Sequence, residues 1–239
     1  MRSDTVWQSH VLVENFLTSV RGGIPFAMEQ IQIALRVLDQ TGRSITQVAD
    51  LGCGDGTIAQ AILTHYPQSQ VCAIDFSEPM LNQAKQNLSD FGDRVRFIQA
   101  DLYYPNWQAE LEPFDAIVSG YCIHHLPDER KRSLYREIYG LLESGGYFLN
   151  IEHVASTSSW IEALFNDVLI DSLYQWHQSH DHALSKEEVA RRFVYREDKD
   201  ANILASVETQ CEWLREIGFQ HVDCYFKFFE LAVFGGMRM

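Results

Sequence analysis

The 239-residue sequence is poor in basic residues, with 19 Lys and Arg against 33 Asp and Glu and a formal net charge of −14. Nucleic acids and anionic membrane surfaces attract clustered Lys and Arg, so we expect neither as a partner. The chain also lacks any apolar run near the ~20 residues needed to cross a bilayer. Ser, Asp, His and Glu interrupt its first residues, which excludes a signal-peptide core. These absences favour a cytoplasmic protein.

The cysteines lack the CxxC spacing of a zinc knuckle. We interpret them as reduced thiols rather than a disulfide scaffold; they are Cys53, Cys72, Cys122, Cys211 and Cys224. No internal repeat or low-complexity segment is present. The hydrophobic fraction of 46% can bury one substantial core, and the length allows one large domain or one domain with a small appendage.

After about residue 46, short apolar runs alternate with longer helical patterns, which is typical of a parallel α/β sheet. The predicted strands are 46–51, 70–75, 95–100, 114–119 and 147–152, and the predicted helices between them are 57–65, 78–88 and 129–142. Gly145 and Gly146 are expected to end the last of these helices.

Three segments lie outside this alternation. Residues 1–45 contain an amphipathic stretch, Ile24–Leu38, and are assigned to an N-terminal helical cap segment. Residues 154–205 are too long for an ordinary connection and are assigned to a helical cap insertion over the α/β core at 46–153. Residues 206–239 contain a predicted helix, 207–217, and a strand pair at 221–225 and 228–234, which completes the core sheet.

The segment Val48–Thr57 joins the first predicted strand to the first helix and carries a glycine loop. Gly52, Gly54 and Gly56 are spaced as GxGxG, and glycine lets the backbone approach a ligand beside the free N–H groups of a helix start. Asp50 precedes the loop. Its charge would repel a diphosphate and attract the ammonium of an amino-acid moiety, so we expect a ligand of the second kind.

The next strand ends also carry acidic residues. Asp75 can accept both hydroxyls of a ribose, and Phe76 after it either lies against a purine or is an ordinary rim aromatic. Asp101 can accept a hydrogen bond from the exocyclic amine of adenine, and Leu102 can pack against the adenine ring. The end of the fourth strand, with Ser119, Gly120 and Tyr121, would lie beneath the amino-acid end of the ligand.

The ordered motifs DLGCGDG, AIDFSEPML, FIQADL, FDAIVSGYCIHHLPD and LLESGGYFLN resemble those of class I S-adenosylmethionine-dependent methyltransferases over residues 46–153. The resemblance implies a Rossmann-like, seven-stranded, mostly parallel sheet with helices on both faces and an antiparallel last strand, here with a helical cap. It implies S-adenosylmethionine as cofactor, with S-adenosylhomocysteine as product, and contacts from Asp50, Gly52, Gly54, Asp75 and Asp101. The rest of the predicted cofactor set is Cys53, Gly56, Phe76, Ser77, Met80, Leu102, Ser119, Gly120 and Tyr121.

The flanks and cap resemble carboxy-S-adenosylmethionine synthases, which convert the cofactor's methyl into a carboxymethyl group using prephenate. The resemblance rests on Arg21–Pro25, Leu164–Asn166, Ser206–Thr209, Gly218-Phe219 and Tyr225–Phe228. It implies that Arg196, close to the matching place of a cap arginine, would clamp a carboxylate, and it suggests a homodimer.

That family has Ser where this chain has Gly54, no acid after it, and a polar residue where this chain has Gly120. We therefore predict methyl transfer to a small-molecule acceptor. The alternatives are a carboxy-S-adenosylmethionine synthase-like enzyme and a non-catalytic S-adenosylmethionine-binding protein. The glycine spacing disfavours a nicotinamide dehydrogenase.

Candidate catalytic residues follow the fourth and fifth strands. His124 is a candidate general base because His titrates near ~6.5, although the His124–Pro127 segment can equally be a packed turn before a helix. Glu152 is the second candidate catalytic residue. His125 and His153 are predicted to contact the acceptor.

The cap adds the aromatic residues Trp160, Tyr174 and Trp176, which either line an acceptor pocket or pack the cap helices. Of these, Trp160 joins Arg196 in the predicted acceptor site. His177, His180 and His182 are ligand-type residues, but they lie in a polar stretch, so no metal is predicted. The basic runs 130–132 and 191–192 are interpreted as helix surface.

Overall fold

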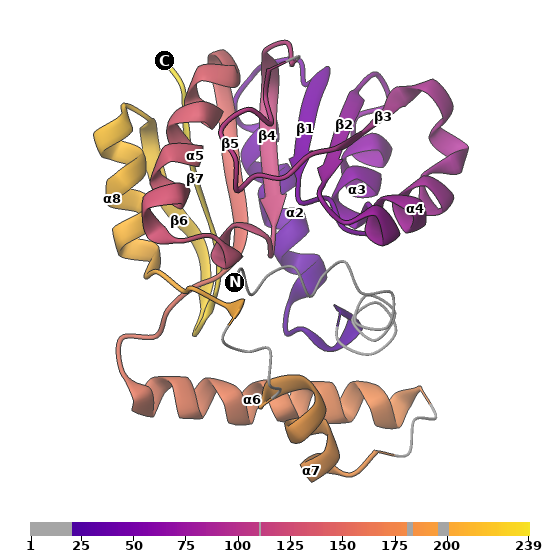
Figure 1. The fold of residues 1–239 in the computed structure, drawn as a ribbon, viewed down its shortest axis with the longest axis vertical. Coiled ribbons are helices and arrows are strands. Elements are labelled where there is room, and N and C mark those ends of the chain that lie inside the picture. The colour runs from indigo at the N-terminus through magenta and orange to yellow at the C-terminus, as the bar shows by residue number, and fades with distance from the viewer. Residues whose placement is uncertain (1–20, 110, 181–183, 196–200) are drawn as a thin grey trace.

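The computed structural model describes residues 21–109, 111–180, 184–195 and 201–239. Its centre is a seven-stranded sheet in the order β3-β2-β1-β4-β5-β7-β6. The strands are β1 (Gln47–Leu51), β2 (Gln70–Asp75), β3 (Val95–Gln99), β4 (Phe114–Gly120), β5 (Leu142–His153), β6 (Gln220–Phe228) and β7 (Leu231–Met237). The first five are parallel, and β7 runs antiparallel to both β5 and β6 (Figure 1). The predicted fold class is confirmed.

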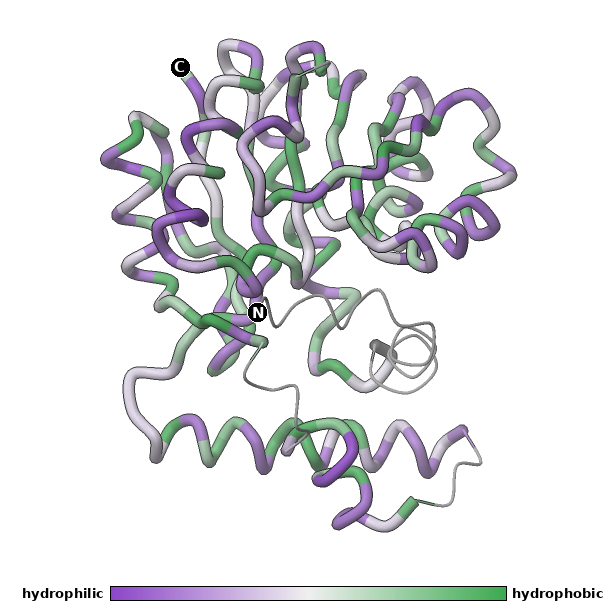
Figure 2. The backbone as a smooth tube through the Cα atoms, viewed as in Figure 1, coloured by the Kyte–Doolittle hydropathy of each residue, from purple (hydrophilic) through white to green (hydrophobic). Residues whose placement is uncertain are grey.

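Alternating apolar side chains give the sheet a core on each face. In β1, Val48 belongs to the core under α2 (Ala27–Asp39) and α3 (Thr57–His65), whereas Ala49 belongs to the core under α5 (Asp128–Leu141) and α8 (Val207–Ile217). This is the two-residue period of a strand that is buried on both sides. The hydrophobic residues accordingly follow the strands in Figure 2. The helix α4 (Glu78–Asn87) packs near the β2–β3 edge.

Local capping chemistry sets several helix starts. The Ser77 hydroxyl accepts the N–H of Met80 at 3.4 Å, and Pro79 lies in the first turn of α4. The Ser206 hydroxyl accepts the N–H of Thr209 at 3.1 Å at the start of α8. Such caps satisfy N–H groups that have no partner within the helix.

The pair Gly145 and Gly146 behaves differently from the prediction. The helix α5 ends at Leu141, and Gly145 and Gly146 lie inside β5. A Cβ on Gly146 would stand 2.8 Å from the carbonyl oxygen of Glu143 and 3.1 Å from that of Asp115. The glycine is therefore needed for close backbone packing in an irregular strand pair, not for ending the helix.

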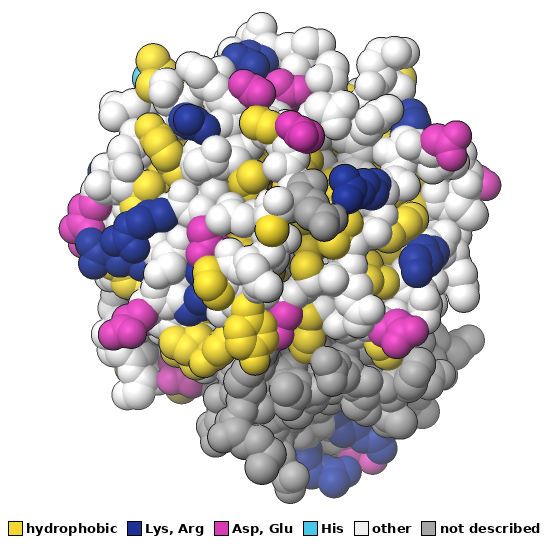
Figure 3. Space-filling view, turned by 45° about the horizontal axis from the view of Figure 1, so that its top comes forward, with side chains coloured by type: hydrophobic (Ala, Val, Ile, Leu, Met, Phe, Trp, Pro, Cys, Tyr) yellow, Lys and Arg dark blue, Asp and Glu magenta, His cyan; other side chains and the backbone are white. Residues whose placement is uncertain are grey.

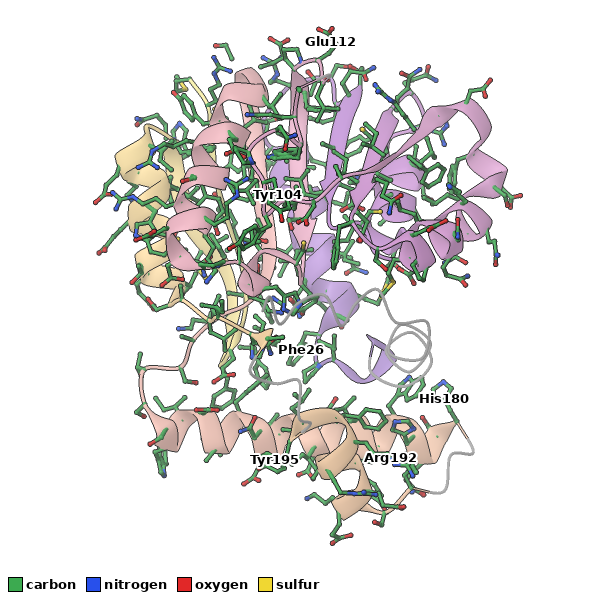
Figure 4. All side chains as sticks on the ribbon, in the orientation of Figure 1. Phe26, Tyr104, Glu112, His180, Arg192 and Tyr195 are labelled. Carbon is green, nitrogen blue, oxygen red and sulfur yellow. The ribbon has the colours of Figure 1, made fainter. Side chains whose placement is uncertain are left out.

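The cap lies beyond the carboxyl ends of β1 to β5. It consists of α6 (Ser159–Ser179), α7 (Lys186–Val189) and a single π-helical turn, η5 (Ala190–Val194). Its own small core includes Ile170, Leu173, Val189 and Val194. In Figure 4, Phe26 lies between the sheet and α6, whereas Arg192 and Tyr195 lie on the cap.

The N-terminal segment joins the two parts. The short helix η2 (Arg21–Gly23) packs on α6, where the Ser172 hydroxyl donates to the carbonyl oxygen of Gly23 at 2.8 Å. The helix α2 instead packs on the sheet, with Ile31 and Leu38 in its core. The η2 end of the predicted N-terminal cap segment therefore contacts α6, whereas α2 contributes to the core of the sheet.

Surface charge is mixed on the face shown in Figure 3, where Lys and Arg side chains are interspersed with Asp and Glu. Lys131 is an exception to the predicted basic helix surface, because it is fully buried and its ammonium binds Asp128 Oδ1 at 2.7 Å and the carbonyl oxygen of Ile203. None of the helices in the described part of the chain is long and apolar enough to span a bilayer.

Candidate functional site

A cavity of 520 Å³ lies between the carboxyl ends of the parallel strands and the cap. Its wall combines the loops after β1, β2 and β4 with the end of β5 and one face of α6. Open α/β sheets bind ligands at this edge. The predicted residues that line it are Gly52, Cys53, Gly54, Asp75, Phe76, Ser77, Met80, Gly120, Tyr121, His124, His125 and His153.

The three glycines of the loop have left-handed backbone conformations, which favour glycine. Gly52 and Gly54 have φ of +66° and +54°. A Cβ on Gly52 would collide with Cys122, whereas a Cβ on Gly54 would meet nothing within 4 Å and would occupy open space at the cavity wall. Gly56, with φ of +84°, serves packing, because its Cβ would stand 2.7 Å from Leu88.

Asp75 ties the loop to the next strand end. Its Oδ2 accepts the N–H of Gly54 at 2.9 Å and its Oδ1 accepts the N–H of Ser77 at 2.8 Å. Burial raises the pKa of this carboxyl, and backbone hydrogen bonds from Ser77, Gly54 and Phe76 oppose that shift. A carboxylate has about four lone-pair sites, so Asp75 keeps acceptor capacity for ligand hydroxyls at the cavity wall.

Several predicted cofactor residues do not line the cavity. Asp50 is fully buried, and its Oδ2 accepts the N–H of Ala59 at 3.0 Å. The Ser119 hydroxyl donates to the carbonyl oxygen of Leu51 at 2.9 Å. Asp101 Oδ1 accepts the N–H of Tyr103 at 2.9 Å, and Leu102 lies in the core. The contacts predicted for these residues and for Gly56 therefore stay predictions.

One predicted acceptor residue is also absent from the wall. Trp160 is 73% exposed at the start of α6 and does not line the cavity. Arg196 lies outside the described residues. Of the other cap aromatics, Trp176 lines the cavity, and Tyr174 packs against the cap core.

His124 and Glu152 form a buried pair at the cavity. His124 Nδ1 lies 2.6 Å from Glu152 Oε1, and His124 lines the cavity while Glu152 is fully buried behind it. The carboxylate also accepts the N–H groups of His124 at 3.0 Å and His153 at 2.9 Å. Burial raises the pKa of Glu152 to about 7. The pair has the geometry of an oriented histidine base.

The segment after the cap closes the cavity beside this pair. The N–H of Ile203 donates to the carbonyl oxygen of His124 at 2.8 Å, and His125 Nδ1 lies 3.2 Å from the carbonyl oxygen of Ala201. The His124–Pro127 segment is therefore a packed turn and also part of the cavity wall, so the two alternatives are compatible.

Among the residues that were not predicted from the sequence, one lies behind the cavity wall and one lies on it. Glu230 binds the ring of His153, with 2.8 Å between its Oε2 and His153 Nε2, and Asn202 lines the wall. If the predicted strand 228–234 had been paired with the predicted strand 147–152, Glu230 would have been placed near His153. Nothing in the local pattern around Asn202 signals a site.

The cap histidines are arranged by ring contacts. His177 stacks on Phe193 with centroids 5.1 Å apart, and His180 stacks on Trp176 at 4.4 Å. His182 lies among the residues that are not described. No group of three His, Cys, Asp or Glu side chains in the described ranges is arranged to hold a metal ion.

Residues 48–146 match the family of methyltransferase domains. This match covers the glycine loop, Asp75 and the His124 turn, which the structure brings to the cavity. The chain carries a class I S-adenosylmethionine-dependent methyltransferase domain. S-adenosylmethionine is its cofactor, and the open position in front of Gly54 and the spare acceptor capacity of Asp75 fit a ligand of this kind.

Two relatives and one solved structure illustrate the range of similarity. The chain is 24% identical to a carboxy-S-adenosyl-L-methionine synthase of Nautilia profundicola over 211 residues, which cover 88% of this chain and 85% of that protein. It is 30% identical to a trans-aconitate 2-methyltransferase of Escherichia coli over 138 residues, which cover 57% of this chain and 50% of that protein. The crystal structure of human N-acetylserotonin methyltransferase with S-adenosylmethionine superimposes with a TM-score of 0.64 at 16% identity, covering 99% of this chain and 59% of that one.

Proposed function

We propose that this methyltransferase transfers a methyl group to a hydroxyl oxygen of a small, largely apolar acceptor. The observation that carries the proposal is the His124–Glu152 pair at the wall of a cavity that extends from the glycine loop to the cap. A hydroxyl must lose its proton as the new oxygen–carbon bond forms, and a positioned histidine can take that proton.

The pair fixes which ring nitrogen accepts the proton. When Nδ1–H of His124 is donated to Glu152, the lone pair lies on Nε2. The buried carboxylate then stabilises the imidazolium that forms. The bound cofactor supplies an activated methyl group on its sulfonium sulfur. Alignment of the acceptor oxygen with that methyl in a closed site contributes the rest of the rate enhancement.

The cap side of the cavity supports an apolar acceptor. Its wall there includes Phe165, Leu169, Leu173, Phe193 and Val194. Apolar pockets with a few polar groups bind small molecules and use the polar groups to orient them. The net charge of −14 agrees with the prediction that the acceptor is not a nucleic acid.

The proposal is tested by comparing His124→Asn and Glu152→Gln with the wild type on a panel of hydroxylated aromatic acceptors. We expect His124→Asn to lower kcat by about 10²–10⁴-fold, the usual contribution of a general base, with unchanged affinity for S-adenosylmethionine. His65→Asn is the matched control, because His65 and Asp39 form a pair of 3.0 Å on the outer surface.

Three results would contradict the proposal. Unchanged turnover of His124→Asn would show that His124 is not the general base. Methylation only of acceptors that lack a hydroxyl would show that the acceptor is not methylated on a hydroxyl oxygen. Tight S-adenosylmethionine binding without turnover across the panel would favour a non-catalytic binding protein.

A carboxy-S-adenosylmethionine synthase-like activity is the second candidate, supported by the relatives that match along most of the chain. Mass spectrometry of the nucleotide that co-purifies with the protein separates the two, because a carboxymethyl sulfonium is heavier by one carboxylate. We expect S-adenosylmethionine or S-adenosylhomocysteine. Formation of the heavier nucleotide from added prephenate would establish the alternative.

We further propose a cytoplasmic location and a homodimer. The location is supported by the five cysteines, all described and none of them in a disulfide. The homodimer rests on the resemblance to the carboxy-S-adenosylmethionine synthases alone. Sedimentation at several protein concentrations tests it.

A further inference from the structure

A second histidine–carboxylate pair lies beside the first. His153 Nε2 is 2.8 Å from Glu230 Oε2, and the side chains of His153 and Glu230 are 19% and 4% exposed. The rings of His153 and His124 have centroids 5.7 Å apart at an angle of 72°. The N–H of His153 also donates to Glu152, so the two pairs are joined through the end of β5.

Strand pairing does not require this second pair. His153 and Leu231 are already partners in the β5–β7 ladder, and the N–H of Val154 donates to the carbonyl oxygen of Glu230 at 2.8 Å. Burying a carboxylate and an imidazole is costly, and apolar side chains of similar volume would hold two strands together as well or better. A buried pair at a cavity wall therefore points to a ligand.

The second pair presents a hydrogen-bond acceptor to the cavity. With Nε2–H donated to Glu230, the lone pair of the His153 ring lies on Nδ1. Nδ1 makes no hydrogen bond with any of the described residues, although His153 lines the cavity. A ligand that binds Nδ1 must therefore bring a hydrogen-bond donor.

We propose that His153, oriented by Glu230, binds a second hydroxyl of the acceptor, next to the hydroxyl that His124 deprotonates. Because the two rings lie this close, ligand oxygens at about 2.8 Å from each ring would lie close to one another. The two oxygens therefore belong on neighbouring carbons of one apolar ring. The acceptor class is then an apolar aromatic compound with two adjacent hydroxyls. This inference rests on the proposed function, and Glu230 acts in it as a positioning residue.

The test measures binding rather than turnover, so its result is independent of methyl transfer. Three probes are titrated by calorimetry into the protein saturated with S-adenosylhomocysteine: 2,3-dihydroxynaphthalene, 3-methoxy-2-naphthol and 2-naphthol. Only the first offers a second donor. We expect it to bind the wild type about 10-fold more tightly than the other two, the order expected for one hydrogen bond in an apolar site.

The variants assign the preference to residues. His153→Phe keeps an aromatic ring but should abolish the preference, and Glu230→Gln should reduce it while leaving some binding. His65→Phe alters the outer pair and should change nothing. Unchanged affinity for S-adenosylhomocysteine and an unchanged Tm in His153→Phe would show that the loss is not structural.

Two results would overturn the inference. One is equal affinity of the wild type for the three probes, including no measurable binding of any. The other is a preference that survives His153→Phe. Failure of the proposed function would show differently, as unchanged turnover of His124→Asn, so the two failures can be told apart.

Discussion

The Glu152 carboxylate is subject to two opposing effects. Burial disfavours its charged form, while hydrogen bonds from the N–H groups of His124 and His153 favour it. Burial is the larger effect, so the pKa of Glu152 rises to about 7 instead of its usual value near 4.5. His124 Nδ1 lies 2.6 Å from this carboxylate, so the charge of Glu152 acts directly on the imidazole ring.

This shift predicts the pH dependence of turnover. A carboxyl with a raised pKa is ionised only above about pH 7, and only the ionised form stabilises the His124 imidazolium. We therefore expect kcat/KM for a hydroxylated acceptor to fall as the pH drops through about 7. In Glu152→Gln, any fall of kcat/KM that remains at low pH would reflect His124 alone. An acid limb near pH 4.5 in the wild type would contradict the assignment.

Gly54 allows a sharper test of the cofactor loop. Gly54 and Gly42 have similar left-handed backbones, with φ of +54° and +69°, and a Cβ on either would meet no atom within 4 Å. Only Gly54 lines the cavity. Ala at either position should cost about 1–2 kcal/mol of stability from backbone strain.

The two substitutions should differ in ligand affinity. Calorimetry with S-adenosylhomocysteine should show a loss of roughly 10-fold or more, at least ~1.4 kcal/mol, for Gly54→Ala. No loss is expected for Gly42→Ala. Equal affinities in the two variants would mean that the ligand does not approach Gly54.

At the scale of elements, the parallel strands were predictable because local pattern determines them. The runs at β1, β2 and β4 are short, apolar and bounded by polar residues or turns, and the structure follows them closely. What the helix α2 packs against could not be predicted, for a different reason. An amphipathic period shows that one helix face is buried, but it does not show whether a sheet or a cap covers it.

The contact between η2 and α6 provides a prediction about the cap. A Cβ on Gly23 would stand 2.6 Å from Leu173 Cδ2 and 3.1 Å from its Cα. Gly23→Ala should therefore push η2 away from α6 and loosen the cap side of the cavity. We expect a higher KM for the acceptor, by roughly 10-fold or about 1.4 kcal/mol, with little change in S-adenosylmethionine affinity.

The control is Gly140→Ala in α5, where a Cβ would meet nothing within 4 Å. Alanine is the better helix former by roughly 0.5–1 kcal/mol, so this variant should be as stable as the wild type or more so. Equal acceptor KM values for the two variants would show that the η2 contact does not shape the acceptor site.

For the molecule as a whole, the site combines residues that are far apart in the chain. The glycine loop and Asp75 could be predicted because strand ends in a parallel sheet meet at one edge. Glu230 and Asn202 could not, because they reach His153 and the His124 turn only through the terminal hairpin and the return from the cap. Long-range pairing of this kind leaves no local signal.

Ligand binding should stabilise the whole fold, since a ligand held only by the native state adds to the free energy of unfolding. At 100 times its Kd, S-adenosylhomocysteine should contribute about 2.7 kcal/mol, which is roughly 5–10 °C in Tm for a chain of this size. Asp75→Asn should reduce this shift, which is measured by calorimetric melting.

Asp115→Asn is the matched control for that measurement. Like Asp75, Asp115 accepts hydrogen bonds from backbone N–H groups, here of Thr46 at 2.9 Å and Gln47 at 3.0 Å, but it does not line the cavity. Its variant should melt at a lower temperature and keep the full ligand shift. A shift that is equally reduced in both variants would place Asp75 outside the cofactor site.

The reversed direction of β7 brings the β6–β7 turn to the same edge of the sheet as the ends of the parallel strands. Glu230 in this turn lies beside His153, whereas the glycine loop comes from a separate part of the chain. We therefore expect mutations in the hairpin turn to change acceptor preference while cofactor affinity is retained. Descendants of one ancestral enzyme could diverge in substrate through this turn, and exchanging turns between relatives is a direct route to engineering new acceptor ranges.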